Sequence, residues 1–321
     1  MKHHMQHVWM LLFLALAPSA LCAESLSIGF GSCVKTPQSS IWESILEAKP
    51  DVFVFLGDNI YLSNKDIGRS DRVRQRYQAL GNLDAVRSLR QNIDVLAIWD
   101  DHDFGPNNAD SSYEHSGISL KEFRKFWGTS SPHHKNFPES VNFKLIHKGV
   151  TILGLDNRSF RVNPGTSKTP TMFGDKQLRW IEKELSSSTT PYVILLSGGQ
   201  LLSEGPWHET LAEYEADKAR VLTAIQKSNS RVVILSGDRH FSEVLSRNFA
   251  GKEILEFTSS PLSSSKAPSY IPSSHALRKT LLIGENNFGM LRLANVNDSK
   301  AEVRLRFHDS KGRIRVQFFS D

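Results

Sequence analysis

Residues 52–61 read VFVFLGDNIY, and this stretch sets the pattern that decides the fold. Its first five residues are apolar and rich in β-branched and aromatic side chains, and a run this short favours a buried strand over a helix. Gly57 and Asp58 then end the apolar run abruptly. The stretch therefore predicts a buried strand that finishes on polar side chains.

The same pattern recurs along the chain and predicts the fold class. Similar apolar runs occupy residues 26–30, 95–99, 150–155, 193–196 and 232–235. Amphipathic stretches typical of helices lie at residues 41–48, 176–185 and 211–226. Strand-like segments at residues 254–258, 288–296, 301–308 and 314–319 follow, with turn residues at 297–298 and 311–312. We expect a mixed α/β (α+β) fold in which two mixed sheets pack together with helices outside.

Five of the strand ends carry residue types that bind metals or phosphate. The candidates are Cys33, Asp58, Tyr61, Asp100, Asp101, His102, Asp103, Asp156, Arg158, Asp238 and His240. Any one of them alone is more often an ordinary turn or a solvated loop. Because α/β proteins place their sites at the carboxyl ends of strands, we expect these side chains to converge on one edge. The combination predicts a shared metal site.

The ligand types indicate which metals would bind. A thiolate from Cys33 with a phenolate from Tyr61 suits Fe³⁺ better than Mg²⁺. Asp58 and Asp238, both in Gly-Asp turns, could bridge or ligate hard cations such as Ca²⁺ or Mn²⁺. Two metals about 3.5–4 Å apart would hold a phosphate and activate water. The alternative for Cys33 is a buried, inert thiol.

The N-terminus predicts export. Residues 8–17 are almost wholly apolar, follow a weakly basic start and precede small residues ending at Ala23, the pattern of a secretory signal peptide. We expect a signal peptide at residues 1–23 and a single mature domain at residues 24–321, secreted or periplasmic. A lipid anchor on Cys22 is the alternative. After cleavage Cys33 is the one cysteine left, so it cannot form an internal disulfide.

Composition bounds the partners. The 321 residues are 39% hydrophobic and 23% charged, as expected for a globular protein with a sizeable core. The formal net charge of +5 comes from basic residues that are mostly scattered, which does not make a nucleic-acid-binding footprint. No second hydrophobic span follows the predicted signal peptide. The expected partner is a small-molecule, lipid or polymer phosphate ester.

The motifs resemble those of the alkaline phosphatase D family of calcineurin-like metallophosphatases. The resemblance rests on five motifs in order: Gly31-Ser32-Cys33, Gly57-Asp58-x-Ile60-Tyr61, Trp99-Asp100-Asp101-His102-Asp103, Asp156-x-Arg158 and Gly237-Asp238-x-His240. Gln200 and residues 285–289 also resemble family segments. Two features depart from the family: Asp103 replaces a glutamate, and the N-terminal β-domain of many members is missing.

The resemblance implies a fold, ligands and roles. It implies a four-layer α/β/β/α sandwich that binds Fe³⁺ and Ca²⁺, with other divalent metals as alternatives. Iron would be held by Cys33, Asp58, Tyr61 and Asp238, with Asp58 bridging to calcium. Asp101 and His240 would serve the second metal. His102 would stand beside the phosphate as proton donor or transition-state stabiliser, and Arg158 would contact the phosphate oxygens. Supporting or uncertain roles fall to Asp100, Asp103, Asp156 and Gln200.

The expected reaction is hydrolysis of phosphate mono- or diesters by a metal-bound hydroxide. One alternative is a phospholipase or phosphodiesterase specialised for lipid or cell-wall diesters, for which Tyr270 and Ile271 offer apolar contacts. A more distant alternative is a metal-binding surface protein without catalysis. The lipid or cell-wall phosphodiesterase would use the same metal site, so the residues alone do not separate it from the main hypothesis.

Overall fold

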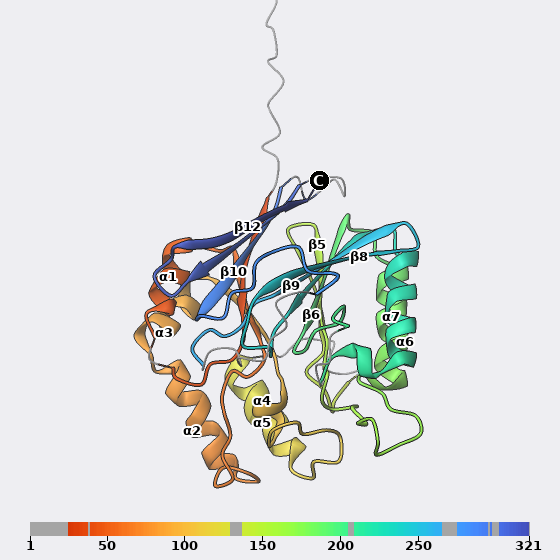
Figure 1. Cartoon of the computed structure of the whole chain (residues 1–321). Coiled ribbons are helices and arrows are strands. Elements are labelled where there is room, and N and C mark those ends of the chain that lie inside the picture. The colour runs from red at the N-terminus through yellow and green to blue at the C-terminus, as the bar shows by residue number, and fades with distance from the viewer. Residues whose placement is uncertain are drawn as a thin grey trace, which may run out of the picture.

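The computed structural model describes residues 25–37, 39–128, 137–204, 209–264, 275–294, 296 and 302–320. Within them, two six-stranded sheets pack face to face (Figure 1). The first sheet has the order β12-β11-β10-β1-β2-β3 and the second β4-β5-β6-β7-β9-β8. The first sheet consists of β1 (Leu26–Gly31), β2 (Val52–Leu56), β3 (Asp94–Ile98), β10 (Asn287–Leu293), β11 (Val303–Asp309) and β12 (Ile314–Ser320). The second consists of β4 (Phe143–His147), β5 (Val150–Gly154), β6 (Tyr192–Ser197), β7 (Arg231–Ser236), β8 (Glu243–Phe249) and β9 (Lys252–Thr258).

Both sheets are mixed, as the sequence predicted. In the first sheet β1, β2 and β3 run parallel, whereas β10, β11 and β12 pair antiparallel. In the second sheet β5, β6, β7 and β9 run parallel, and β4 and β8 close the two edges in antiparallel pairing. The parallel strands all end on the same side, which brings their polar carboxyl ends together.

The apolar runs are nearly continuous because the central strands are buried on both faces. In β2, Val54 and Leu56 point into the core between the sheets. Phe53 and Phe55 point to the opposite face and pack beneath helices. Burying each such side chain stabilises the fold by about 1.5–3 kcal/mol. Because its side chains alternate between the two faces, β2 contributes to two separate hydrophobic layers.

Helices cover the outer face of each sheet and complete four layers, α/β/β/α (Figure 1). The first sheet is covered by α1 (Ile41–Ala48), α2 (Ser70–Gly81), α3 (Asp84–Asn92) and α5 (Ser116–Trp127). The second sheet is covered by α6 (Gly174–Ser186) and α7 (Glu215–Lys227). The helix expected at residues 211–226 is divided into the short 3₁₀ helix η2 (Leu211–Glu213) and α7. The predicted architecture is confirmed.

Several predictions concern residues that the structure does not describe. They are the signal peptide at residues 1–23 with Cys22, the loop residues Tyr270 and Ile271, and the turn at residues 297–298. In the described part of the chain, no helix combines the length and hydrophobicity needed to cross a membrane.

Candidate metal centre

Carboxyl ends of strands from both sheets meet at one site. The loop after β1 pairs with the loop after β2, because the Cys33 amide donates to the Gly57 carbonyl at 3.2 Å. The loop after β7 joins from the second sheet, where the Asp238 amide donates to Ser32 Oγ at 3.1 Å. Cys33, Asp58 and Asp238, which are far apart in sequence, therefore lie at a single junction between the sheets.

Cys33 lies at the base of this junction. Its Sγ lies 3.6 Å from Asp58 Oδ2 and 3.6 Å from the carbonyl oxygen of Asp238. Ser260 Oγ approaches the sulfur to 3.2 Å. Complete burial, with the charges of Asp58 and Asp238 added, raises the pKa of the thiol well above its ordinary value. A thiolate at this position therefore requires a nearby cation.

Tyr61 and His240 extend the group around Cys33. The Tyr61 hydroxyl donates to Asp58 Oδ2 at 3.2 Å and lies 3.2 Å from His240 Nε2. Burial raises the pKa of Tyr61 far above its ordinary value. Burial, with the charge of His102 added, lowers the pKa of His240 to about 4. His240 is therefore neutral at physiological pH, as a metal-ligating imidazole must be.

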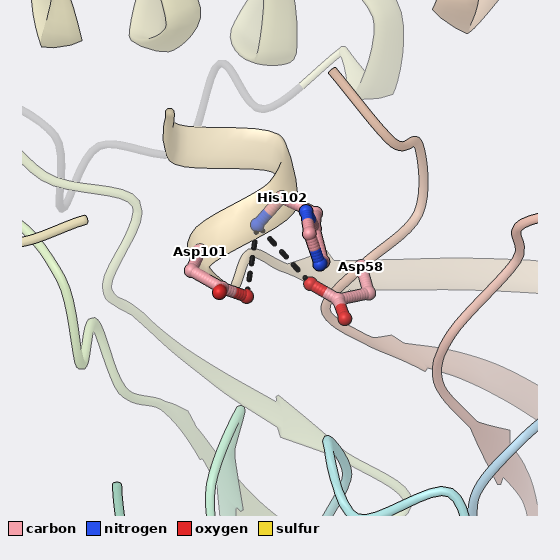
Figure 2. A group of neighbouring side chains, drawn as sticks. All are labelled: Asp58, Asp101 and His102. Carbon is pink, nitrogen blue, oxygen red and sulfur yellow. Dashed lines mark hydrogen bonds between the residues drawn. The ribbon is translucent and has the colours of Figure 1, made fainter. Parts of the chain in front are cut away.

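A second group forms around the first turn of α4 (Asp101–Phe104), which begins at the end of β3 (Figure 2). The ligand atoms of Asp58, Asp101 and His102 lie within 4.8 Å of one another. The His102 amide donates to Asp58 Oδ1 at 3.2 Å and to Asp101 Oδ1 at 2.9 Å. Asp58 thus belongs to both groups: Oδ2 faces Cys33 and Tyr61, and Oδ1 faces His102.

His102 lies beside the ligand candidates. Its ring stacks on Tyr61 with 4.2 Å between centroids. Within the described part of the chain, its buried Nδ1 has no hydrogen-bond partner. His240 Nε2 lies 3.2 Å from the Tyr61 hydroxyl, and its place beside the second metal stays a prediction. Tyr61 therefore contacts both histidines, one through its ring and the other through its hydroxyl.

Four candidate ligands have a left-handed backbone although none is glycine. They are Cys33 (φ 65°), Asp58 (φ 52°), Asp238 (φ 68°) and His240 (φ 55°). Such a conformation costs on the order of 1–2 kcal/mol per residue and is typical of functional sites. Tight packing holds it in place: a Cβ on Gly237, before Asp238, would lie 2.6 Å from Ser32 Cβ.

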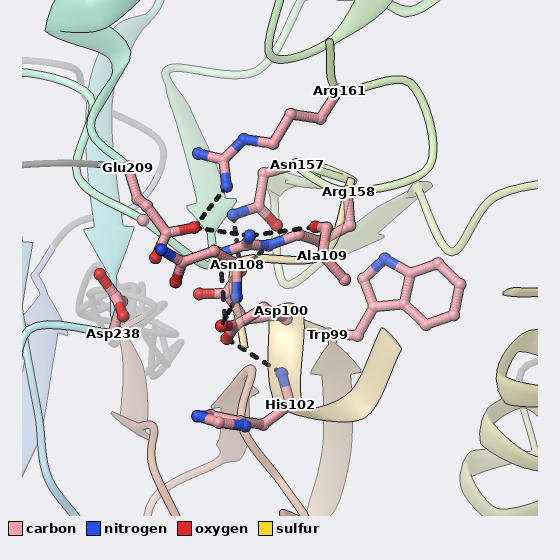
Figure 3. A network of polar contacts seen from close by, with 12 residues as sticks. Trp99, Asp100, His102, Asn108, Ala109, Asn157, Arg158, Arg161, Glu209 and Asp238 are labelled. Carbon is pink, nitrogen blue, oxygen red and sulfur yellow. Dashed lines mark hydrogen bonds and ion pairs between the residues drawn. The ribbon is translucent and has the colours of Figure 1, made fainter. Parts of the chain in front are cut away.

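Arg158 belongs to a buried network beside the metal centre (Figure 3). Its Nε donates to Asp100 Oδ1 at 2.5 Å, and its Nη1 donates to Glu209 Oε1 at 2.7 Å. Its Nη2 lies 3.9 Å from Asp101 Oδ1. Arg161 Nη1 donates to the same Glu209 oxygen at 2.6 Å. The observed contacts hold acidic neighbours in place, and contact between Arg158 and phosphate stays a prediction.

Asp103 and Asp156 accept hydrogen bonds from the loops around the metal centre. Asp103 Oδ2 accepts from the Asn59 amide at 3.1 Å and the Asp100 amide at 3.2 Å, and Oδ1 accepts from Tyr77 at 2.8 Å. Asp156 accepts from Trp99 Nε1 at 2.8 Å and from amides of its own loop. Both carboxylates therefore position the loops that carry Asp58 and Arg158.

Gln200 lies in the second sheet's part of the polar network. Its Nε2 donates to Glu243 Oε1 at 2.8 Å and to Thr258 Oγ1 at 2.9 Å. Among the described residues, its Oε1 has no partner. The contacts observed for Gln200 are with β8 and β9, and none is with the ligand candidates.

The charge of the site fits bound cations. Four aspartates are buried together, Asp58, Asp100, Asp101 and Asp103, and the partly buried Asp238 lies beside them. Burial, then repulsion from neighbouring carboxylates, raises the pKa of Asp58 well above its usual range. Burial raises the pKa of Asp103 and of Asp238 to about 7 each, although Arg239 opposes the rise at Asp238. Metal ions would remove this repulsion, and thiol, phenol, imidazole and carboxylate donors suit transition metals.

Sequence reasoning missed residues that complete the site. Ser260 contacts Cys33 Sγ and accepts from the His240 amide at 2.9 Å, and Glu209 links the two buried arginines. Both lie in loops without a periodic pattern, so no sequence signal singles them out. Asn59 and Asn157 lie inside the quoted motifs, and their buried amide contacts could have been proposed from that position.

Comparisons with known proteins bear on the family and the fold. A family model described as PhoD-like phosphatase matches residues 148–316, just over half of the 321 residues. The solved structure of PhoD superposes with a TM-score of 0.70 at 16% identity, covering 91% of this chain and 72% of that one. Purple acid phosphatase PPD1 from yellow lupin (Lupinus luteus) seeds superposes with a TM-score of 0.69 at 11% identity, covering 92% and 54%. No curated protein sequence matches. At these identities the two structures share the fold.

Proposed function

The chain belongs to the PhoD-like phosphatase family and is a metal-dependent hydrolase of phosphoric esters, and from this premise we propose where and on what it acts. We propose an exported enzyme that hydrolyses phosphate mono- or diesters at the junction described above. Its metal ligands are Cys33, Asp58, Tyr61, Asp101, Asp238 and His240. The non-catalytic alternative is set aside because the chain belongs to a phosphatase family.

One observation carries this proposal: Asp58 presents its two oxygens to two different groups. Oδ2 lies 3.6 Å from Cys33 Sγ and accepts from Tyr61, whereas Oδ1 accepts from the His102 amide beside Asp101. A carboxylate placed in this way suits a bridge between two metal ions. Such a pair, when bound, lowers the pKa of a water molecule and neutralises charge on the phosphate oxygens.

The chain's own residues supply orientation and a proton. His102 is held by stacking on Tyr61, and its imidazole is the proposed proton donor to the leaving alkoxide. Arg158 donates hydrogen bonds to Asp100 and Glu209, holds these two carboxylates in place and keeps positive charge near the phosphate site. Asp103 fixes the amides of the loop that carries Asp58.

We propose iron and calcium as the metals, and a secreted or periplasmic location. The thiol and phenol favour Fe³⁺, and oxygen donors on the Asp101 side favour Ca²⁺. Export is supported by the signal-peptide pattern at residues 1–23. A single mature domain at residues 24–321 is supported by the common core between the two sheets.

The test combines metal analysis with paired substrates. Elemental analysis of the purified protein is expected to find iron with calcium. Assays on p-nitrophenyl phosphate and on its bis-ester rank monoesters against diesters. Cys33→Ala is expected to lose iron and activity together, because the sulfur is the softest donor at the junction.

Cys33→Ser is the matched control, since it keeps an oxygen donor at nearly the same volume. It is expected to retain more metal than Cys33→Ala while keeping the same fold by circular dichroism. Full metal content and full activity in Cys33→Ala would remove Cys33 from the site and contradict the proposed centre.

A further inference from the structure

A second charged site lies on the first sheet, away from the metal centre. A cavity of about 500 Å³ opens on the outer face of this sheet beside the end of α1. We call it the basic cavity; its charged lining is Lys49, Arg292, Arg304 and Arg306, and Ser27 and His308 also line it. Figure 1 shows α1 beside β10 and β12, which frame this half of the sheet. No carboxylate is among the described residues that line it.

The strand register concentrates positive charge in this cavity. Arg292 of β10 stands directly opposite Arg304 of β11, and Arg306 follows two residues later on the same face. Like charges directly opposite each other in an antiparallel pair are destabilising. The sequence therefore places guanidinium groups that repel one another at positions where neutral side chains would give a more stable folded protein.

Acidic neighbours compensate only part of this charge. Arg304 is paired with Glu302 at 2.5 Å and lies over the exposed Phe319 ring at 6.0 Å. Among the described residues, Arg292, Arg306 and Lys49 have no ion-pair partner. By contrast, Arg313 and Arg315 of the same sheet both pair with Asp309. Among the described residues in the strands of the first sheet, the arginines without an ion pair therefore both line the cavity.

The cavity and the metal centre lie at opposite ends of β1. Ser27 is near the start of this strand and Gly31 is at its end, roughly 13 Å away at about 3.3 Å per residue. Cys33 lies beyond Gly31. A ligand in the basic cavity therefore does not occupy the place of the ester being hydrolysed.

We propose that the basic cavity is a second anion site that binds the phosphate group of a ligand other than the reacting ester. Arginine guanidinium groups match phosphate oxygens in bidentate geometry, and Lys49 adds a point charge. The volume lies in the range of ligand sites and suits a discrete group. The phosphate comes either from free phosphate or from a lipid headgroup, and the experiment separates these sources.

The test reads each arginine separately in the full protein. Phenylglyoxal modifies free guanidinium groups, and peptide mass spectrometry gives the rate at each position. Inorganic phosphate is expected to slow modification of Arg292, Arg304 and Arg306 by about fivefold, as for a site about 80% occupied. Arg87 is the matched control for Arg304, since both are about half exposed and ion-paired, and it is expected to be unprotected.

A double variant supplies the second arm. Arg292→Gln with Arg306→Gln is expected to abolish protection of Arg304 while leaving hydrolysis of p-nitrophenyl phosphate unchanged. Arg87→Gln with Arg179→Gln removes the same charge elsewhere and is expected to leave protection intact. The rate of phenylglyoxal modification is measured independently of catalysis. Failure of the proposed anion site is therefore distinguishable from failure of the proposed catalytic function.

The outcomes identify the source of the phosphate. Protection by inorganic phosphate supports a site for free phosphate. Protection by phosphatidylglycerol vesicles alone, with none from phosphatidylcholine vesicles, supports a lipid headgroup. Equal protection by chloride at matched ionic strength, or no protection in any arm, would overturn the proposal.

Discussion

The metal centre and the basic cavity lie at opposite ends of one sheet and hold opposite charges in opposite settings. Asp58, Asp100, Asp101 and Asp103 of the metal centre are buried, and Asp58 and the partly buried Asp238 adopt a left-handed backbone. The arginines of the basic cavity are exposed on regular strands with uninterrupted register. Each end gathers like charges, yet the strongly shifted pKa values lie at the buried end, and among the described residues that line the basic cavity only Lys49 has a left-handed backbone.

Solvent explains this difference. Exposed charges about 5 Å apart are weakened by water and salt, so the arginines repel one another at little cost. Buried carboxylates lack that screening and favour the protonated form unless a cation is present. A buried cluster of like charge therefore indicates a missing counter-charge far more strongly than an exposed one does.

The largest effect is expected where the two metal groups share a residue. Asp58→Asn keeps the side-chain volume and removes the shared charge, so kcat/KM is expected to fall about 10³-fold, equivalent to about 4 kcal/mol. The same change relieves repulsion, so the metal-free variant is expected to melt at a higher temperature than the metal-free wild type. Calorimetry measures the melting temperature, and ester hydrolysis measures kcat/KM. Unchanged metal content would contradict the shared role.

The next effect is the pH dependence of the metal-free protein. The folded-state pKa values of Asp103, Asp238 and Glu256 are raised to about 7, and that of Asp58 is also raised. Their contribution is full below the unfolded pKa near 4 and is lost as pH rises through 7. Unfolding free energy is expected to fall by more than about 1 kcal/mol per pH unit between pH 5 and 7.

Metal provides the control for this pH dependence. Because ions displace protons from their ligands, the loaded protein is expected to gain stability over the same range. The measurement is urea denaturation with and without metal. A metal-free protein whose stability rises from pH 5 to 7 would contradict the assigned direction of these shifts.

A smaller effect is expected at the hydrogen bonds that support Asp58. Asp103→Asn replaces an acceptor by a donor facing the Asn59 amide and is expected to cost about 2 kcal/mol of stability. Tyr77→Phe removes one hydrogen bond to Asp103 and is expected to cost about 1 kcal/mol. Thermal unfolding with activity assays tests the order, and a larger loss for Tyr77→Phe would reverse it.

The smallest effect is expected at the basic cavity. Arg292→Gln with Arg306→Gln removes cross-strand repulsion and is expected to stabilise the protein by about 0.5 kcal/mol at low salt. High salt is expected to abolish the gain, because it already screens exposed charges. Urea denaturation at two ionic strengths measures it. A loss of several kcal/mol would show that these arginines support the fold.

Much of the fold could be predicted because the central strands are buried on both faces. Runs such as residues 52–56 and 232–235 carry that information in composition alone. α2 was missed because it buries only Val73, Tyr77 and Leu80 on an otherwise charged surface. β4 and β8 were missed because edge strands are half exposed and lack a continuous apolar run.

The candidate ligands could be proposed because they directly follow buried strands, whereas their detailed partners could not. The contacts of Tyr61 with both His102 and His240 depend on how the two sheets meet. Glu209 and Ser260 reach the site from loops whose course the local sequence does not determine. Register and crossing geometry, which no short motif encodes, supply this information.

The left-handed backbone at Cys33, Asp58, Asp238 and His240 also bears on how the protein tolerates mutation. Glycine adopts that conformation without strain, so glycine at Asp238 or His240 would ease folding while deleting a ligand. Selection for stability alone would therefore replace the candidate ligands by glycine, and only selection for turnover would retain them. A screen that rewards expression would enrich inactive variants at these four positions, and a screen that rewards hydrolysis would remove them.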